Sequence, residues 1–128
     1  MKHAMIEKVN TLFDAVTKDE RWNINDGTLF DAFGMSLYGY AFGFGRLICF
    51  LEAEDINTII EEKLISLGAG EKYVKGLVDY AFSTFQTPTE GILSQLISIG
   101  HSHFADSNIT DLKELIFKNA EILKKNYP

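Results

Sequence analysis

The histidines are the residues of this chain whose chemistry first suggests a metal site. His101 and His103 lie two positions apart, and on a helix such side chains point about 200° away from each other. Helical ligands of one metal ion are instead spaced by four, or occasionally three, positions. His3 is distant in the sequence. The spacing therefore predicts no metal site and no bound cofactor, with His103 half-buried and hydrogen-bonded on a partly apolar helix face.

The glycine-rich segment 39–46, GYAFGFGR, is superficially similar to a phosphate-binding loop. It lacks the lysine and hydroxyl residue that end a P-loop, and Ile48 occupies the third glycine position of a dinucleotide-binding pattern that starts at Gly43. The sequence carries no nucleophile elbow, whereas a catalytic triad whose members meet only in the folded chain stays open. Cys49 lies in the apolar run LICFL and is expected to be a buried thiol. These features favour a protein that is not an enzyme.

The acidic residues are concentrated in the N-terminal half of the chain. The formal net charge of the 128 residues is −6, and residues 19–55 hold seven acidic residues against two arginines, a local balance of −5. Such a field repels phosphate backbones and anionic membranes and attracts basic partners. We therefore expect no direct contact with nucleic acid or membrane, and a basic protein as the partner.

Helices must position these residues, because apolar side chains recur at helical spacing along most of the chain. With 46% hydrophobic residues, the chain is long enough to form one domain, 1–128, around its own core. The expected fold is all-α, a single compact bundle of five to seven helices around a central apolar helix. The predicted helices span about 3–18, 28–52, 56–67, 71–85 and 88–104, and a last one begins at Ser107 or Thr110.

The segment 28–52 has two distinct apolar faces when it is drawn as a helix. The bulky face consists of Phe30, Phe33, Leu37, Tyr40, Phe44, Leu47, Ile48 and Leu51. The small face consists of Ala32, Ser36, Gly39 and Gly43. A helix that is apolar nearly all round is normally buried, and a stripe of small residues lets a neighbouring backbone approach closely. A strand or hairpin over residues 35–44 is the competing interpretation, because glycines weaken a helix.

No segment has the features of a membrane span or a leader. The uncharged run from Ala32 to Gly45 is shorter than the roughly 20 apolar residues that a spanning helix needs. The first ten residues carry Glu7 and Lys8 before any apolar run, which is unlike a secretory signal. A single cysteine, which can form no internal disulfide, fits a reducing compartment. The sequence therefore predicts a cytoplasmic protein.

Local signals mark the expected helix ends. Asp26 or Thr28 is expected to cap the 28–52 helix, because short polar side chains accept hydrogen bonds from the first free backbone N–H groups. Gly68, in the segment GAG, suits a left-handed C-cap after the 56–67 helix. The segment 87–90, TPTE, has the pattern of a capping box and predicts the start of the fifth helix.

Trp22 stands in a polar turn among Asp19, Glu20 and Asp26. An aromatic side chain among carboxylates is typical of an interface hot spot that faces a cationic partner. The alternative is that Trp22 packs onto the first helix as part of the fold.

In size, charge and predicted helicity, the chain resembles the small acidic bacterial immunity proteins that neutralise nuclease toxins. The resemblance rests on these general features and on the acidic stretches 19–26 and 52–55, and no motif carries it. It implies an inhibitor that covers the active site of a basic toxin and has no enzymatic activity. The predicted partner-binding residues, expected to share one outward-facing region, are Asp19, Glu20, Trp22, Asp26, Glu52, Glu54, Asp55, Glu61 and Glu62.

Two other functions stay open. The first is a helical small-molecule-binding domain with a pocket beside the small-residue stripe, lined by Tyr38, Tyr40, Arg46 and His103. The second is a helical regulator or adaptor.

Overall fold

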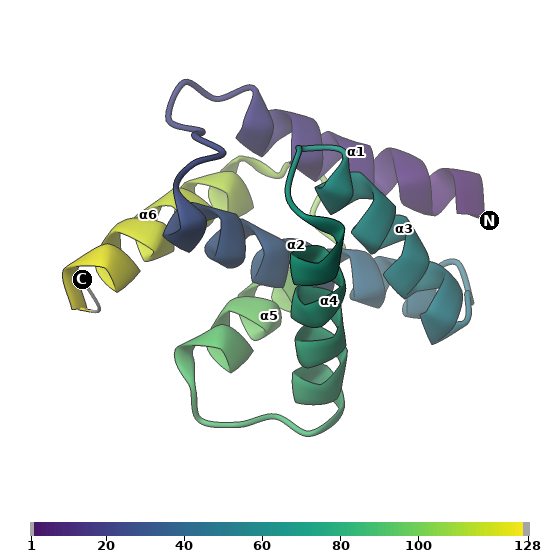
Figure 1. Cartoon of the computed structure of the whole chain (residues 1–128). Helices are drawn as coiled ribbons and strands as arrows, with labels where there is room; N and C mark the ends of the chain where they lie inside the picture. Colours follow the sequence, from purple (N-terminus) through teal and green to yellow (C-terminus); the bar gives the residue numbers. More distant parts are fainter. Residues whose placement is uncertain (1, 127–128) are drawn as a thin grey trace.

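The computed structural model describes residues 2–126 and is helical, which confirms the predicted all-α fold (Figure 1). Turns and loops of up to nine residues join its helices, and no strand occurs within these residues. The helices are α1 (Lys2–Thr17), α2 (Gly27–Leu47), α3 (Ala53–Ile65), α4 (Glu71–Gln86), α5 (Ile92–Ser102) and α6 (Thr110–Asn126).

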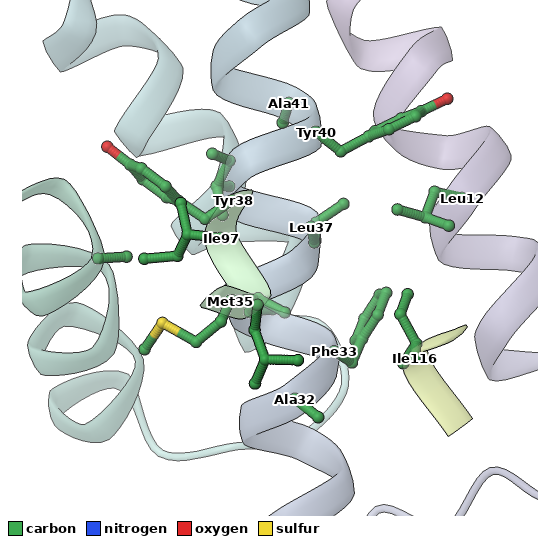
Figure 2. Packing of buried hydrophobic residues seen from close by; sticks show 14 of the residues in the cluster. Leu12, Ala32, Phe33, Met35, Leu37, Tyr38, Tyr40, Ala41, Ile97 and Ile116 are labelled. Atoms are coloured by element: carbon green, nitrogen blue, oxygen red, sulfur yellow. The ribbon is translucent and has the colours of Figure 1, made fainter. Parts of the chain in front are cut away.

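Helix α2 is the centre of the bundle, as predicted, and the other five helices surround it (Figure 1). Most of its 21 residues are buried, because it contacts every other helix of the structure. Figure 2 shows Phe33, Leu37 and Tyr40 extending to one side of α2, toward Leu12 of α1 and Ile116 of α6. Burial of these large side chains supplies the main free energy that stabilises the fold.

The small-residue stripe of α2 packs directly against the backbone of α5. A Cβ atom added to Gly39 would lie 1.9 Å from the carbonyl oxygen of Ile97, and one added to Gly100 would lie 1.9 Å from that of Ser36. The two helices therefore cross backbone to backbone, which confirms the helix and excludes the hairpin over 35–44. Helix α5 and Phe104 cover the stripe at Gly39 and Gly43, so these two glycines are not open to a ligand.

The N-terminus of α2 follows the prediction. Asp26 is the N-cap residue, and its Oδ1 accepts a hydrogen bond from the Leu29 backbone N–H at 3.1 Å. The left-handed glycine after α3 is also confirmed, because Gly68 has a φ of 94°.

Helix α2 ends at Leu47, five residues before the predicted end at Glu52. Leu47 and Ile48, which the sequence assigned to the buried bulky face, are 57% and 46% exposed. The apolar pattern continues into the turn, but α3 begins at Ala53 with acidic residues in its first turn. Those acids interact favourably with the N-terminal end of the dipole of α3. A new helix therefore begins at Ala53, and the turn that precedes it ends α2 at Leu47.

The predicted start of the fifth helix is wrong as well. Helix α5 begins at Ile92 with Gly91 as its N-cap residue. Thr87, the expected cap, instead ends α4, and its backbone N–H donates to the Ser83 carbonyl at 3.0 Å. Gly91 interrupts the pattern, because its backbone is extended, with a φ of −77° and a ψ of 164°, and glycine weakens a helix.

None of the helices within residues 2–126 is long and apolar enough to cross a bilayer.

Candidate functional site

The nine predicted partner-binding residues do not form one surface. Asp55 pairs with Lys2 at the N-terminal end of α1, whereas Asp19 lies just beyond the C-terminal end of the same helix. The 16 residues of α1 span about 24 Å, which separates the two acidic groups. The residues therefore have to be considered as three groups: 19–26, 52–55 and 61–62.

In the first group, Asp19 belongs to an internal ion-pair network. Its Oδ2 lies 2.9 Å from Arg21 Nη2 and 3.3 Å from Lys113 Nζ of α6. Arg21 also pairs with Glu114 at 2.7 Å and covers the ring of Phe117 at 4.1 Å from its centroid. The hydrogen bonds from Arg21 hold the pKa of Asp19 well below its usual range. This carboxylate fastens the α1–α2 loop to α6 and is already neutralised.

Asp26 and Trp22 also serve the fold. Asp26 caps α2 and forms an ion pair with Lys124 of α6. Burial raises the pKa of Asp26, but the bonds from Lys124 and from the Leu29 backbone N–H together outweigh it, and the pKa is lowered overall. Trp22 is partly buried, and its ring meets that of Phe33 edge to face at 5.5 Å. Trp22 thus packs into the bundle against α2, and Glu20 is left as the exposed acid of this group.

The second group lies at the turn between α2 and α3, which presents an apolar patch beside carboxylates. We call Leu47, Ile48, Phe50, Glu52 and Glu54 the α2–α3 corner. Phe50 is 80% exposed, more than any other large hydrophobic side chain within residues 2–126. Glu52 is the N-cap residue of α3 but makes no side-chain capping bond. Glu54 is exposed as well, so both carboxylates face solvent.

Phe50 has a backbone conformation that is unusual for its residue type. Its φ is 56°, in the left-handed region that glycine and asparagine favour. The turn is held by bonds from Cys49 N–H to the Phe44 carbonyl at 3.1 Å and from Leu51 N–H to the Gly45 carbonyl at 2.9 Å. Cys49, on one side of Phe50, is buried, which confirms the predicted buried thiol. The backbone conformation at position 50 thus disfavours phenylalanine, and the exposed ring adds nothing to the core.

A cavity of about 330 Å³ opens beside the α2–α3 corner. Arg46 and Glu52 give it opposite charges, and Arg46 is held in place because its Nη1 donates to the Leu51 carbonyl at 2.8 Å. The cavity is large enough to receive one side chain of a partner. Its lining residues are Phe42, Arg46, Glu52, Ala53, Phe82, Phe85 and Gln86.

The third group lies farther along α3. Glu62 is exposed, and Glu61 is partly buried. Burial raises the pKa of Glu61; Lys75 of α4 lowers it, whereas Asp79 of α4 raises it further. Glu61 therefore faces α4 and its charges, whereas Glu62 lines a pocket with Val9 and Asn10 of α1.

The apolar members of the α2–α3 corner are not among the site residues predicted from the sequence. Leu47 and Ile48 match helical spacing and were assigned to the core, and Phe50 received no role. One available signal was the segment AED at 53–55, because acidic residues favour the first turn of a helix. A helix that begins there requires a turn, and that turn leaves a phenylalanine outside the preceding helix.

The histidines do not lie together. His103 is half-buried, and its Nδ1 lies 2.5 Å from Asp106 Oδ2, which confirms the predicted hydrogen-bonded histidine. His101 lies between the rings of Phe85 and Phe104, each with its centroid 5.3 Å away. Within residues 2–126, no group of three His, Cys, Asp or Glu side chains could hold a metal ion.

Within the described surface, the α2–α3 corner therefore combines an exposed phenylalanine with unpaired carboxylates and an adjoining cavity. Comparisons with protein-family models, curated proteins and solved structures found no match for the chain.

Proposed function

We propose that this chain is a non-enzymatic binding protein that uses the α2–α3 corner to cover a basic protein. The proposed role is that of an inhibitor, as in the immunity proteins that neutralise nuclease toxins. The observation that carries the proposal is Phe50, which is 80% exposed and has a φ of 56°. A large apolar side chain in a strained, solvent-facing position is expected where a partner covers it.

Phe50 would supply the apolar part of the binding energy. A phenylalanine side chain buries about 150–250 Å² when it is fully covered. Covering the exposed ring would contribute up to about 4 kcal/mol, at roughly 25 cal/mol per Å². That magnitude is typical of an interface hot spot, and Leu47 and Ile48 beside it would exclude water from the contact.

The carboxylates would supply attraction toward a basic partner. Glu52 and Glu54 have no ion-pair partner among residues 2–126, whereas Asp55 is paired with Lys2 at 3.6 Å. The whole chain carries a net charge of −6, which adds a long-range attraction for cationic surfaces. Nuclease active sites are basic because they bind phosphates, and an acidic surface is steered to them quickly.

The test compares the wild-type chain with two variants as affinity baits in a lysate of the source organism. Phe50→Gly removes the ring and suits the left-handed backbone, so the variant is expected to fold. Ile122→Ala is the control, because Ile122 is 40% exposed on α6, away from the corner. A basic protein that binds wild type and the control, but is lost with Phe50→Gly, would support the proposal.

Two further measurements connect binding to inhibition. The captured protein is assayed for nucleic-acid cleavage with and without the chain, and inhibition is expected to disappear with Phe50→Gly. Glu52→Gln with Glu54→Gln should slow association at low salt and matter little at high salt. A partner that binds Phe50→Gly as well as wild type would overturn the proposal. Retained partner activity in the complex would leave an adaptor and exclude the inhibitor.

A further inference from the structure

Helix α4 presents a second exposed surface, on the side of the helix that faces away from the core. We call Lys72, Tyr73, Gly76, Asp79 and Tyr80 the α4 face. Tyr73 and Tyr80 are 53% and 49% exposed. The largest of the cavities described, about 400 Å³, lies along this face between α4, α2 and the start of α5. Met35, Leu77 and Leu93 make its floor mainly apolar.

Gly76 is a glycine that the fold of one chain does not require. A Cβ atom added at this position would meet nothing within 4 Å, in contrast to Gly39 and Gly100 at the helix crossing. A glycine in the middle of a helix weakens that helix relative to alanine. What the missing side chain does provide is room for another backbone to approach between the two tyrosines.

The residues around Gly76 have a self-complementary arrangement. At about 100° per residue, Lys72 and Asp79 lie about 40° and 60° to one side of Gly76. Tyr73 and Tyr80 lie about 60° and 40° to the other side. Within each pair, one residue precedes Gly76 and the other follows it by a similar distance. A two-fold axis midway between two facing Gly76 residues makes the two helices antiparallel and brings each residue opposite the other member of its pair.

We infer that the α4 face binds a second copy of this chain, with the two α4 helices antiparallel and crossing at Gly76. Lys72 then faces Asp79 of the second copy, and Tyr73 faces Tyr80 of the second copy, twice each by symmetry. Gly76 meets the same glycine, which permits close contact of the two backbones. This inference does not depend on the proposed function, because the α2–α3 corner is a different surface.

The charges and the aromatic ring are available for this contact in the single chain. Lys72 and Asp79 form no ion pair within residues 2–126. The neighbouring Lys75 is paired with Glu71 at 3.0 Å. The hydroxyl of Tyr73 donates to Asp31 of α2, which holds the ring in place before a second copy arrives.

The test is sedimentation velocity over a wide range of protein concentration with charge-reversal variants. Wild type is expected to dimerise as concentration rises. Lys72→Asp places two carboxylates opposite each other, and Asp79→Lys places two ammonium groups opposite each other. Each variant alone should dimerise at least about tenfold more weakly than wild type. Lys125→Asp makes the same charge change at an exposed position of α6 and should leave dimerisation unchanged.

Mixing the two variants gives the sharpest result. An equimolar mixture of Lys72→Asp and Asp79→Lys restores an opposite-charge pair on both sides of the two-fold axis, so a heterodimer should form. Gly76→Ala should raise the melting temperature of the monomer and weaken the dimer at least about tenfold. A wild type that stays monomeric at every concentration, or a dimer that neither reversal weakens, would overturn the inference. Phe50→Gly should dimerise normally, which separates this test from that of the proposed function.

Discussion

Gly39→Ala is the substitution for which the structure gives the clearest expectation. The added methyl carbon would lie 1.9 Å from the Ile97 carbonyl oxygen and 2.9 Å from the His101 nitrogen. Carbon and carbonyl oxygen normally approach no closer than about 3.3 Å. Both neighbours are backbone atoms of α5, so no side-chain rotation can relieve the clash. Helices α2 and α5 would have to separate by more than an ångström.

The expected cost is large because that separation opens the centre of the core. Inserting a methyl group into packed structure typically costs about 1–3 kcal/mol, and rigid backbone on both sides places this position at the upper end. Alanine recovers up to about 1 kcal/mol through its better helix propensity. The net loss is therefore expected to be about 2 kcal/mol or more. Because urea slopes are about 1–3 kcal/mol per molar, the unfolding midpoint should fall by roughly 1 M.

The assay is urea unfolding followed by circular dichroism, with Gly76→Ala as the control. Gly76 is also a helical glycine, but its added methyl meets nothing within 4 Å. At concentrations where the chain is monomeric, Gly76→Ala should raise the free energy of unfolding by about 0.5–1 kcal/mol. Glycine-to-alanine substitution is thus expected to lower the free energy of unfolding at position 39 and to raise it at position 76. A Gly39→Ala protein as stable as wild type would refute the backbone contact between α2 and α5.

The remaining predictions concern one turn, one ion pair and one thiol. Phe50→Gly should leave the free energy of unfolding unchanged or raise it by up to about 1 kcal/mol, because relief of backbone strain exceeds the cost of the added chain entropy. A clearly lower free energy of unfolding in urea would mean that the ring stabilises the single chain. The pKa of Asp19 is lower in the folded than in the unfolded chain, where it is about 4. The Asp19 carboxylate therefore stabilises the fold above about pH 4, and this stabilisation is lost as the pH falls from there toward the folded-state pKa. Asp19→Asn should therefore reduce stability at pH 7 and flatten its decline in acid, and equal pH profiles for the two proteins would contradict the pairing with Arg21 and Lys113. Cys49 is 2% exposed, so a thiol reagent should react with it only as fast as the chain unfolds, and immediate labelling of the native protein would contradict its burial.

The parts of the fold that could be predicted from the sequence are those governed by local spacing. The stripe of Ser36, Gly39 and Gly43 indicated a close backbone approach, and α5 makes that approach at Gly39. Asp26 was predicted as a cap because a cap depends on residues next to it in the chain.

The parts that could not be predicted depend on which segments meet. Asp19 and Asp26 look like free surface acids in the sequence, but their cationic partners Lys113 and Lys124 lie in α6, at the far end of the chain. Helical spacing at Leu47 and Ile48 continues past the residue where the helix stops, because turn residues also carry apolar side chains. The candidate surface was therefore found only in part: its acids were predicted, and its aromatic anchor was not.

The crossing of α2 and α5 has a consequence for how the chain folds as it is synthesised. Gly39 and Gly100 are roughly sixty residues apart, so the central contact is a non-local one that forms late in chain growth. Until α5 has left the ribosome, the apolar stripe on α2 has nothing to cover it. A nascent chain that ends before α5 should therefore expose this stripe, and chaperones that bind apolar helices should recognise it there.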